Sequence, residues 1–137
     1  ARALLLPALR STPAARVRTL DLSRGALQRG ATAPGLFLFD LVLAAAPAEA
    51  EAAADGNPGL LSRAADFHAQ QNEFAAAIRL YRRVTALAPA DARAHAALGY
   101  LLVHAGDRPG GAAEWRRALE LQPDFPGLSG RLRQLGE

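Results

Sequence analysis

The chain has 137 residues, half of them hydrophobic, and this length fits one small domain. All sixteen basic residues are arginines, and the formal net charge is +3 at pH 7. Cysteine is absent, which excludes disulfides and metal sites built from thiolates.

Residues 1–33 are rich in arginine and poor in acidic residues, with Asp21 as the one exception. The arginines of this segment are Arg2, Arg10, Arg16, Arg18, Arg24 and Arg29. Prolines and glycines interrupt the segment, and only residues 19–28 have a loosely helical pattern, so we expect an extended basic arm. A partner would order this arm, and the alternative is that it packs back on the rest of the chain. Its arginines suit the phosphates of RNA, an acidic protein or anionic lipid headgroups. The arm has no aromatic residues, which argues against base-specific reading of RNA.

The beginning of the chain also resembles an organellar transit peptide, because it combines arginines with a lack of acidic residues. A leucine run that starts at Leu4 ends at Pro7 and is too short for the core of a secretory signal. The composition favours a mitochondrial or chloroplast location, with the bacterial cytoplasm as the alternative.

Residues 34–57 comprise an apolar stretch and an acidic, alanine-rich linker. Asp40 is the only charged residue between Pro34 and Pro47. The stretch is too short to span a bilayer as a helix, which takes about 20 residues. Because it is apolar on all faces, we expect a buried helix, either packed on the helical repeats that follow or inserted into a partner. Its docking residues are Leu36, Phe37, Phe39, Leu41 and Leu43.

Residues 58–125 contain one pattern twice, at a spacing of 34 residues. The pairs in this register include Tyr81 with Trp115, Leu87 with Leu121, and Pro89 with Pro123. Each copy has two runs of apolar residues at helical spacing, separated by a break at Asn72 or at Gly106. A repeat of this length predicts stacked helical hairpins.

These residues resemble the tetratricopeptide repeat (TPR) family, in which small residues lie where two helices cross. An aromatic residue in the second helix and a closing proline complete its signature. The matching positions are Ala64, Ala65, Ala77, Tyr81 and Pro89 in residues 58–91, and Gly99, Gly111, Trp115 and Pro123 in residues 92–125. The resemblance implies an all-α fold with two TPR-like hairpins, and residues 126–137 are expected to form a capping helix.

In the TPR family the first helix of each hairpin lines a groove that holds a partner. The resemblance therefore implies the groove residues Ser62, Asp66, Gln70, Arg93, Ala96, Tyr100 and Val103. Some family members hold an acidic chain terminus with basic and amide side chains on this face. Asp66 stands where such a group would help, so a carboxylate-binding groove is not expected. The alternative is that these positions are merely solvated.

No catalytic residue, cofactor or metal site is predicted. His68, His95 and His104 lack companions at ligand spacing, and Gly110 follows a helix, not the strand of a phosphate-binding loop. The predicted function is a non-catalytic protein–protein interaction module, an accessory or assembly subunit of a larger complex. Its arm would dock on the other protein subunits while the groove binds a partner. The alternative is an RNA-associated protein of the peripheral ribosomal type.

Overall fold

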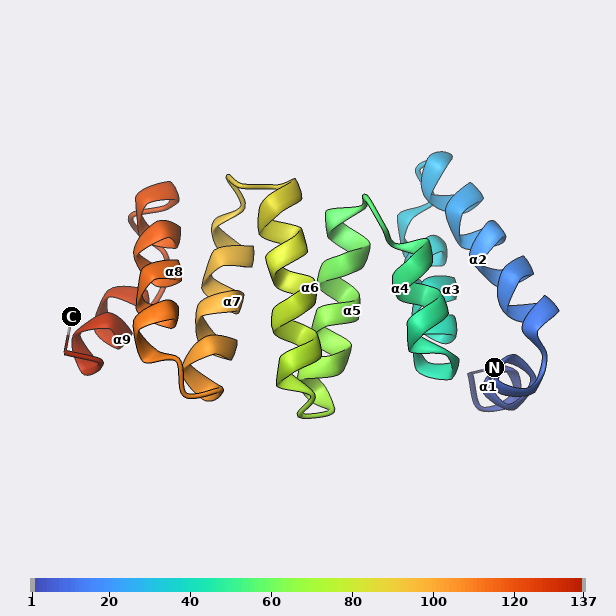
Figure 1. Cartoon of the computed structure of the whole chain (residues 1–137). Helices are drawn as coiled ribbons and strands as arrows, with labels where there is room; N and C mark the ends of the chain where they lie inside the picture. The colour runs from blue at the N-terminus through green and yellow to red at the C-terminus, as the bar shows by residue number, and fades with distance from the viewer. Residues whose placement is uncertain (1, 137) are drawn as a thin grey trace. The chain divides into compact units, whose positions relative to one another are not determined.

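The structure, a computed structural model, describes residues 2–136, and in that range every regular element is an α-helix (Figure 1). The helices are α1 (Arg2–Ser11), α2 (Pro13–Gln28), α3 (Thr32–Ala45), α4 (Pro47–Ala53), α5 (Pro58–Gln70), α6 (Phe74–Leu87), α7 (Ala92–His104), α8 (Arg108–Leu121) and α9 (Leu128–Gln134). The predicted all-α fold is confirmed. The chain divides into two compact units, and the boundary falls between Asp55 and Gly56. No described helix has the length and hydrophobicity needed to cross a membrane.

The extended arm predicted for residues 1–33 is wrong, because most of that segment forms α1 and α2. Pro13 was counted as a break, but it occupies the first turn of α2, where its missing N–H costs no helical hydrogen bond. Pro34 lies in the first turn of α3 in the same way. Both α1 and α2 pack against α3, so the chain itself supplies the partner that orders this segment.

Small residues bring α2 and α3 together as a helical hairpin. The Ser23 hydroxyl donates a hydrogen bond of 2.7 Å to the Gly35 carbonyl, and both residues are buried. A Cβ added at Gly35 would lie 2.6 Å from Cγ of Leu27, so a larger residue would force the helices apart. The helices α2 and α3 are therefore held together by close contact through small residues, although α2 has no clear apolar stripe in its sequence.

The apolar helix α3 is the core of the first unit. Within that unit it packs against α1, α2 and α4. These contacts leave Phe39 only 1% exposed and bury Leu41 and Leu43 as well. Leu36 is half-buried, and Phe37 is 47% exposed. The sequence predicted either the repeats or a partner as the cover for this helix, but helices that precede it in the chain provide much of that cover.

Arg16 ties three segments of the first unit together. Its Nε and Nη2 atoms form a forked pair with the Glu49 carboxylate of α4, at 2.8 and 2.7 Å. Its Nη1 atom donates to the carbonyls of Leu9 and Arg10 at the end of α1, at 2.8 and 3.1 Å. The Arg16 side chain is 12% exposed, so this fork is held in place and is not available to a phosphate.

The Arg16 fork predicts that acid weakens the first unit. The hydrogen bond from Arg16 lowers the pKa of Glu49 below its ordinary value of 4.5. A lowered folded-state pKa contributes stability above pH 4.5 that is lost as the pH falls through the folded value. Glu49→Gln should therefore lower the Tm at neutral pH, and the difference from wild type should shrink below pH 4.5. Thermal melts followed by circular dichroism across this range measure it.

Asp21→Asn is the matched control. Asp21 pairs with Arg24 at 3.5 Å, and both side chains are about two-thirds exposed. An ion pair this exposed contributes little to stability. An equal loss of Tm in both variants would contradict a specific role for the fork.

The second unit is built from the hairpins α5–α6 and α7–α8, followed by α9 (Figure 1). Side-chain caps set where three of these helices begin. Asn57 accepts from the Leu60 amide at 3.1 Å, which satisfies an N–H that the first turn of α5 leaves open. Asp91 caps α7 and Asp107 caps α8 in the same way. At the hairpin turns Asn72 and Gly106 have positive φ, which ends one helix and reverses the chain.

Two glycines allow α7 and α8 to cross at close range. A Cβ at Gly111 would lie 2.8 Å from the Gly99 carbonyl oxygen, and a Cβ at Gly99 would lie 3.0 Å from the Gly111 carbonyl oxygen. Trp115 lies beside this crossing, and its indole N–H donates to the Ala96 carbonyl at 3.1 Å. The small residues expected at this crossing therefore lie where the TPR resemblance implies.

Trp115 is the centre of the core that joins α7, α8 and α9. It is 3% exposed and packs with Leu128 and Leu132 of α9. The Tyr100 ring meets the indole edge to face, with centroids 5.1 Å apart. The capping helix expected in residues 126–137 is present as α9, which covers this end of the core with its buried leucines.

Candidate functional site

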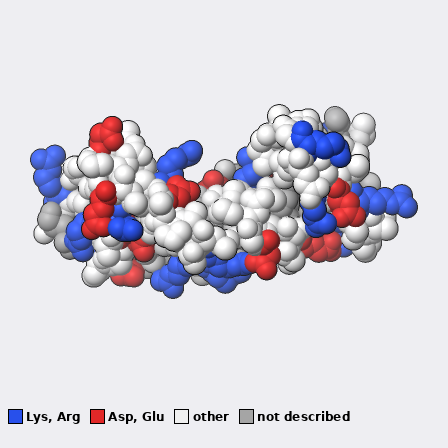
Figure 2. Space-filling view, turned by 90° about the horizontal axis from the view of Figure 1, so that it is seen from above, with Lys and Arg blue, Asp and Glu red and all other residues white. Residues whose placement is uncertain are grey.

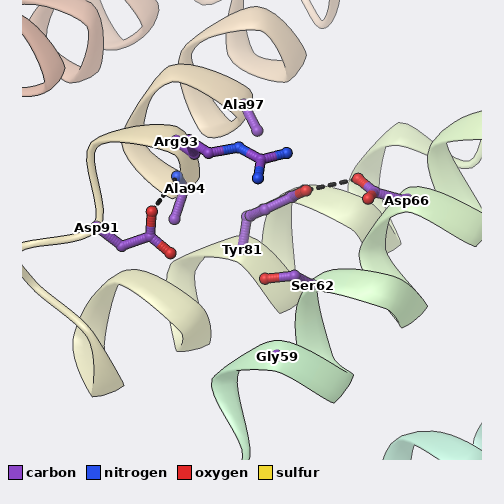
Figure 3. Close-up of a pocket in the computed structure, with 8 residues that line it drawn as sticks. All are labelled: Gly59, Ser62, Asp66, Tyr81, Asp91, Arg93, Ala94 and Ala97. Atoms are coloured by element: carbon purple, nitrogen blue, oxygen red, sulfur yellow. Dashed lines mark hydrogen bonds between the residues drawn. The ribbon is translucent and has the colours of Figure 1, made fainter. Parts of the chain in front are cut away.

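An open pocket of about 440 Å³ lies within the second unit, between α5, α6 and the start of α7 (Figure 3). Its lining residues are Gly59, Ser62, Asp66, Tyr81, Asp91, Arg93, Ala94 and Ala97. The lining combines three charged side chains and two hydroxyls with small residues that leave space open. Such a mixture suits the binding of a polar chain segment more than an apolar ligand.

Helical geometry and one cap place the polar groups of the pocket. Ser62 and Asp66 are four residues apart and therefore share one face of α5. Asp91 is fixed because its carboxylate accepts from the Ala94 amide at 3.2 Å. Arg93 and Ala97 share a face of α7 for the same reason as the α5 pair.

Tyr81 is the wall that α6 contributes. Its ring is nearly buried, at 6% exposed, while its hydroxyl reaches the Asp66 carboxylate at 2.5 Å (Figure 3). Burial, together with the hydrogen bond to Asp66, raises the pKa of Tyr81 well above its ordinary value of 10. The hydroxyl therefore stays protonated and donates to Asp66, which fixes the orientation of that carboxylate in the pocket.

Arg93 is the only cationic side chain among the lining residues. It is exposed, and among residues 2–136 its guanidinium has no hydrogen-bonded or ion-paired partner. Figure 3 shows the guanidinium above the Tyr81 side chain, close to its hydroxyl. An unused planar donor beside two carboxylates gives the pocket both signs of charge.

The structure brings together three of the seven predicted groove residues: Ser62, Asp66 and Arg93 line the pocket. Ala96 is 2% exposed in the core around Trp115, so its side chain cannot form part of a groove. This face of α7 packs against α8, because Ala96 lies in the same core cluster as Ala112 and Trp115.

The other three predicted groove residues lie outside the pocket lining. Tyr100 and Val103 are half-buried against the core cluster, and the Arg131 guanidinium lies 4.8 Å from the centre of the Tyr100 ring. Gln70 is exposed at the end of α5.

Sequence reasoning missed Tyr81 and Asp91 as pocket residues. Tyr81 was assigned to the family aromatic of the second helix, and only the structure shows that its hydroxyl reaches Asp66. Asp91 precedes an alanine-rich helix, which is the pattern of an N-cap, and that pattern was a usable signal.

Two of the three histidines have structural roles. The two ring nitrogens of His95 contact the Glu114 carboxylate at 2.6 Å and the Pro89 carbonyl at 2.9 Å. His68 contacts Glu73 at 2.7 Å across the α5–α6 turn. Within residues 2–136 no three histidine or acidic side chains gather as a metal site would require.

The arginines predicted as arm contacts lie on α1, on α2 and just after α2. Arg16 is engaged in the fork to Glu49, and Arg24 is 3.5 Å from Asp21. The other four are exposed: Arg2, Arg10, Arg18 and Arg29. On the face seen in Figure 2, basic side chains are dispersed among uncharged surface and acidic side chains.

No protein-family model and no curated protein matches the sequence. Solved structures do match: the first TPR of Spaghetti (RPAP3) bound to the HSP90 peptide SRMEEVD has a TM-score of 0.59 at 17% identity, over 88% of this chain and 90% of that one. The N-terminal domain of stress-induced protein-1 from C. elegans has a TM-score of 0.56 at 15% identity, over 90% and 95%. A mutant of the Thermobaculum terrenum O-GlcNAc transferase has a TM-score of 0.57 at 28% identity, over 91% of this chain but 23% of that protein. The chain therefore has a TPR-like fold.

Proposed function

We propose that this protein is a non-catalytic interaction module that binds a segment of a partner protein in the pocket between α5, α6 and α7. The observation that carries the proposal is the set of polar groups in the pocket that still have bonding capacity: the guanidinium of Arg93, unpaired within the described part of the chain, and the carboxylates of Asp66 and Asp91, each held through one oxygen. A solved domain of similar fold is bound to an HSP90 peptide, which supports a peptide as the ligand. We take the protein to be an accessory or assembly subunit.

Apolar side chains on the first unit support a second contact in such an assembly. Leu4 is 82% exposed, Leu22 is 60% exposed and Phe37 is 47% exposed. Exposed apolar side chains of this size are a common part of protein interfaces. The first unit would dock on a neighbouring subunit, which is the role predicted above for an extended arm.

A bulky residue in the pocket should weaken partner binding strongly. Ala97→Trp places an indole in the open space beside Tyr81, so peptides selected from a random library against the wild-type chain should lose at least about tenfold in affinity. Fluorescence anisotropy with the full chain measures the loss, and circular dichroism confirms that the variant folds.

The matched control is Ala113→Trp, because Ala113 is an exposed alanine of α8 that does not line the pocket. If both variants bind the selected peptides as tightly as wild type does, the pocket is not the binding site. Ala97→Leu repeats the test with a smaller block in case the indole disturbs α7.

A role in RNA association is the second candidate. Arg2, Arg10, Arg18 and Arg29 are exposed, and among the described residues their guanidinium groups have no acidic partner. An affinity for single-stranded RNA that falls steeply with salt, and that replacement of these arginines by glutamine removes, would support this role. An unchanged affinity in that variant would exclude it.

A further inference from the structure

The charges of the pocket carry information about its ligand. Asp66 and Asp91 bring two negative charges, and Arg93 brings one positive charge, so the lining is net acidic. A ligand group buried among them meets more favourable interactions if it is cationic than if it is anionic.

Each carboxylate is fixed through one oxygen and keeps the other for a ligand. Oδ1 of Asp66 accepts from the Tyr81 hydroxyl, and Oδ1 of Asp91 accepts from the Ala94 amide. Within residues 2–136 the second oxygen of each has no hydrogen-bond donor. A carboxylate held in this way does not have to be reoriented on binding, and a charge-assisted bond to it is stronger than one between neutral groups.

The rest of the lining suits the stem of a long basic side chain. The Tyr81 ring forms one wall, while Gly59 and Ala97 have little or no side chain to fill the space. Arginine and lysine place their methylene groups along apolar surface and extend only the charged end to polar groups. Arg93 is exposed, so a peptide carbonyl or an acidic neighbour in the ligand can accept from it.

We propose that the pocket takes an arginine or lysine side chain of an extended partner segment, with Asp66 and Asp91 as its acceptors. The inference rests on the proposed function and names the chemistry of its partner. The same charges disfavour a chain-terminal carboxylate as the ligand, because two carboxylates would repel it and only one arginine would attract it.

The test starts from peptides that the full-length chain selects from a random library and that Ala97→Trp no longer binds. These peptides should share an arginine or a lysine. Citrulline has nearly the shape of arginine without its charge, so replacing that arginine by citrulline should weaken binding about three- to tenfold. Asp66→Asn and Asp91→Asn should each cause a similar loss, although the amide oxygens can still accept from Tyr81 and from the Ala94 amide.

Asp107→Asn is the matched control. Asp107 caps α8 through the Gly110 amide at 2.9 Å, as Asp91 caps α7, but it does not line the pocket. The affinity of the Asp107→Asn variant for the selected peptides should equal that of the wild type.

The outcomes separate the two proposals. Peptides that depend on the pocket but lack basic residues, or that bind through a free carboxyl terminus, would overturn the inference and leave the proposed function standing. If the library yields no peptide that Ala97→Trp blocks, the proposed function itself fails.

Discussion

Trp115→Ala is expected to destabilise the second unit by about 3–5 kcal/mol, the range for removing a large buried aromatic side chain. The indole is 3% exposed and is shared by α7, α8 and α9, so its loss leaves a cavity that three helices border. It also removes the N–H that bonds to the Ala96 carbonyl. Urea denaturation followed by circular dichroism measures the free energy of unfolding.

Arg117→Ala on the same helix is the control for this experiment. Arg117 is exposed, and within residues 2–136 it pairs only with exposed Glu120, so its replacement should change the free energy of unfolding by no more than about 0.5 kcal/mol. A Trp115→Ala loss as small as that of Arg117→Ala would show that this core does not hold α9 against the hairpin.

Gly111→Ala is expected to cost about 1–3 kcal/mol through overpacking, although alanine favours a helix more than glycine does. The new Cβ would lie 2.8 Å from the Gly99 carbonyl oxygen and would also meet the Val103 side chain. Backbone cannot move aside as a flexible side chain does, so α7 and α8 would have to separate. Trp115, the only tryptophan, reports the unfolding of this unit by its fluorescence.

Gly130→Ala separates overpacking from helix propensity. Gly130 lies in α9, and a Cβ there would have no neighbour within 4 Å. This change should stabilise the protein by about 0.5–1 kcal/mol, because it only reduces the freedom of the unfolded chain. If Gly111→Ala were also stabilising, the close crossing of α7 and α8 would be contradicted.

The sequence predicted the hairpins of residues 58–125 because their signals are local. The spacing of apolar residues predicts each helix, and Asn72 and Gly106 mark the turns between the helices. The 34-residue register then relates Tyr81 to Trp115. The first unit has no such repeat. Its α2–α3 contact depends on Ser23 and Gly35, and hydropathy has no signal for small residues that allow close approach.

The candidate site was only partly predictable, for a similar reason. The repeat register identifies the first helix of each hairpin and the face that lines the groove. That face includes three residues of the pocket, Ser62, Asp66 and Arg93. The hydroxyl of Tyr81 reaches the pocket from the second helix, and Asp91 reaches it from a cap. Those positions depend on how neighbouring helices pack, and spacing along one helix does not reveal them.

The central claim is that the pocket between α5, α6 and α7 binds a partner peptide. The most direct measurement is to titrate a selected peptide into the isotope-labelled full-length chain and follow the backbone amide resonances by NMR. We predict that the largest shifts fall on residues 59–66 and 91–97, which include most of the pocket lining. The largest shifts on α8 and α9, or on the first unit, with these residues unmoved, would contradict the claim.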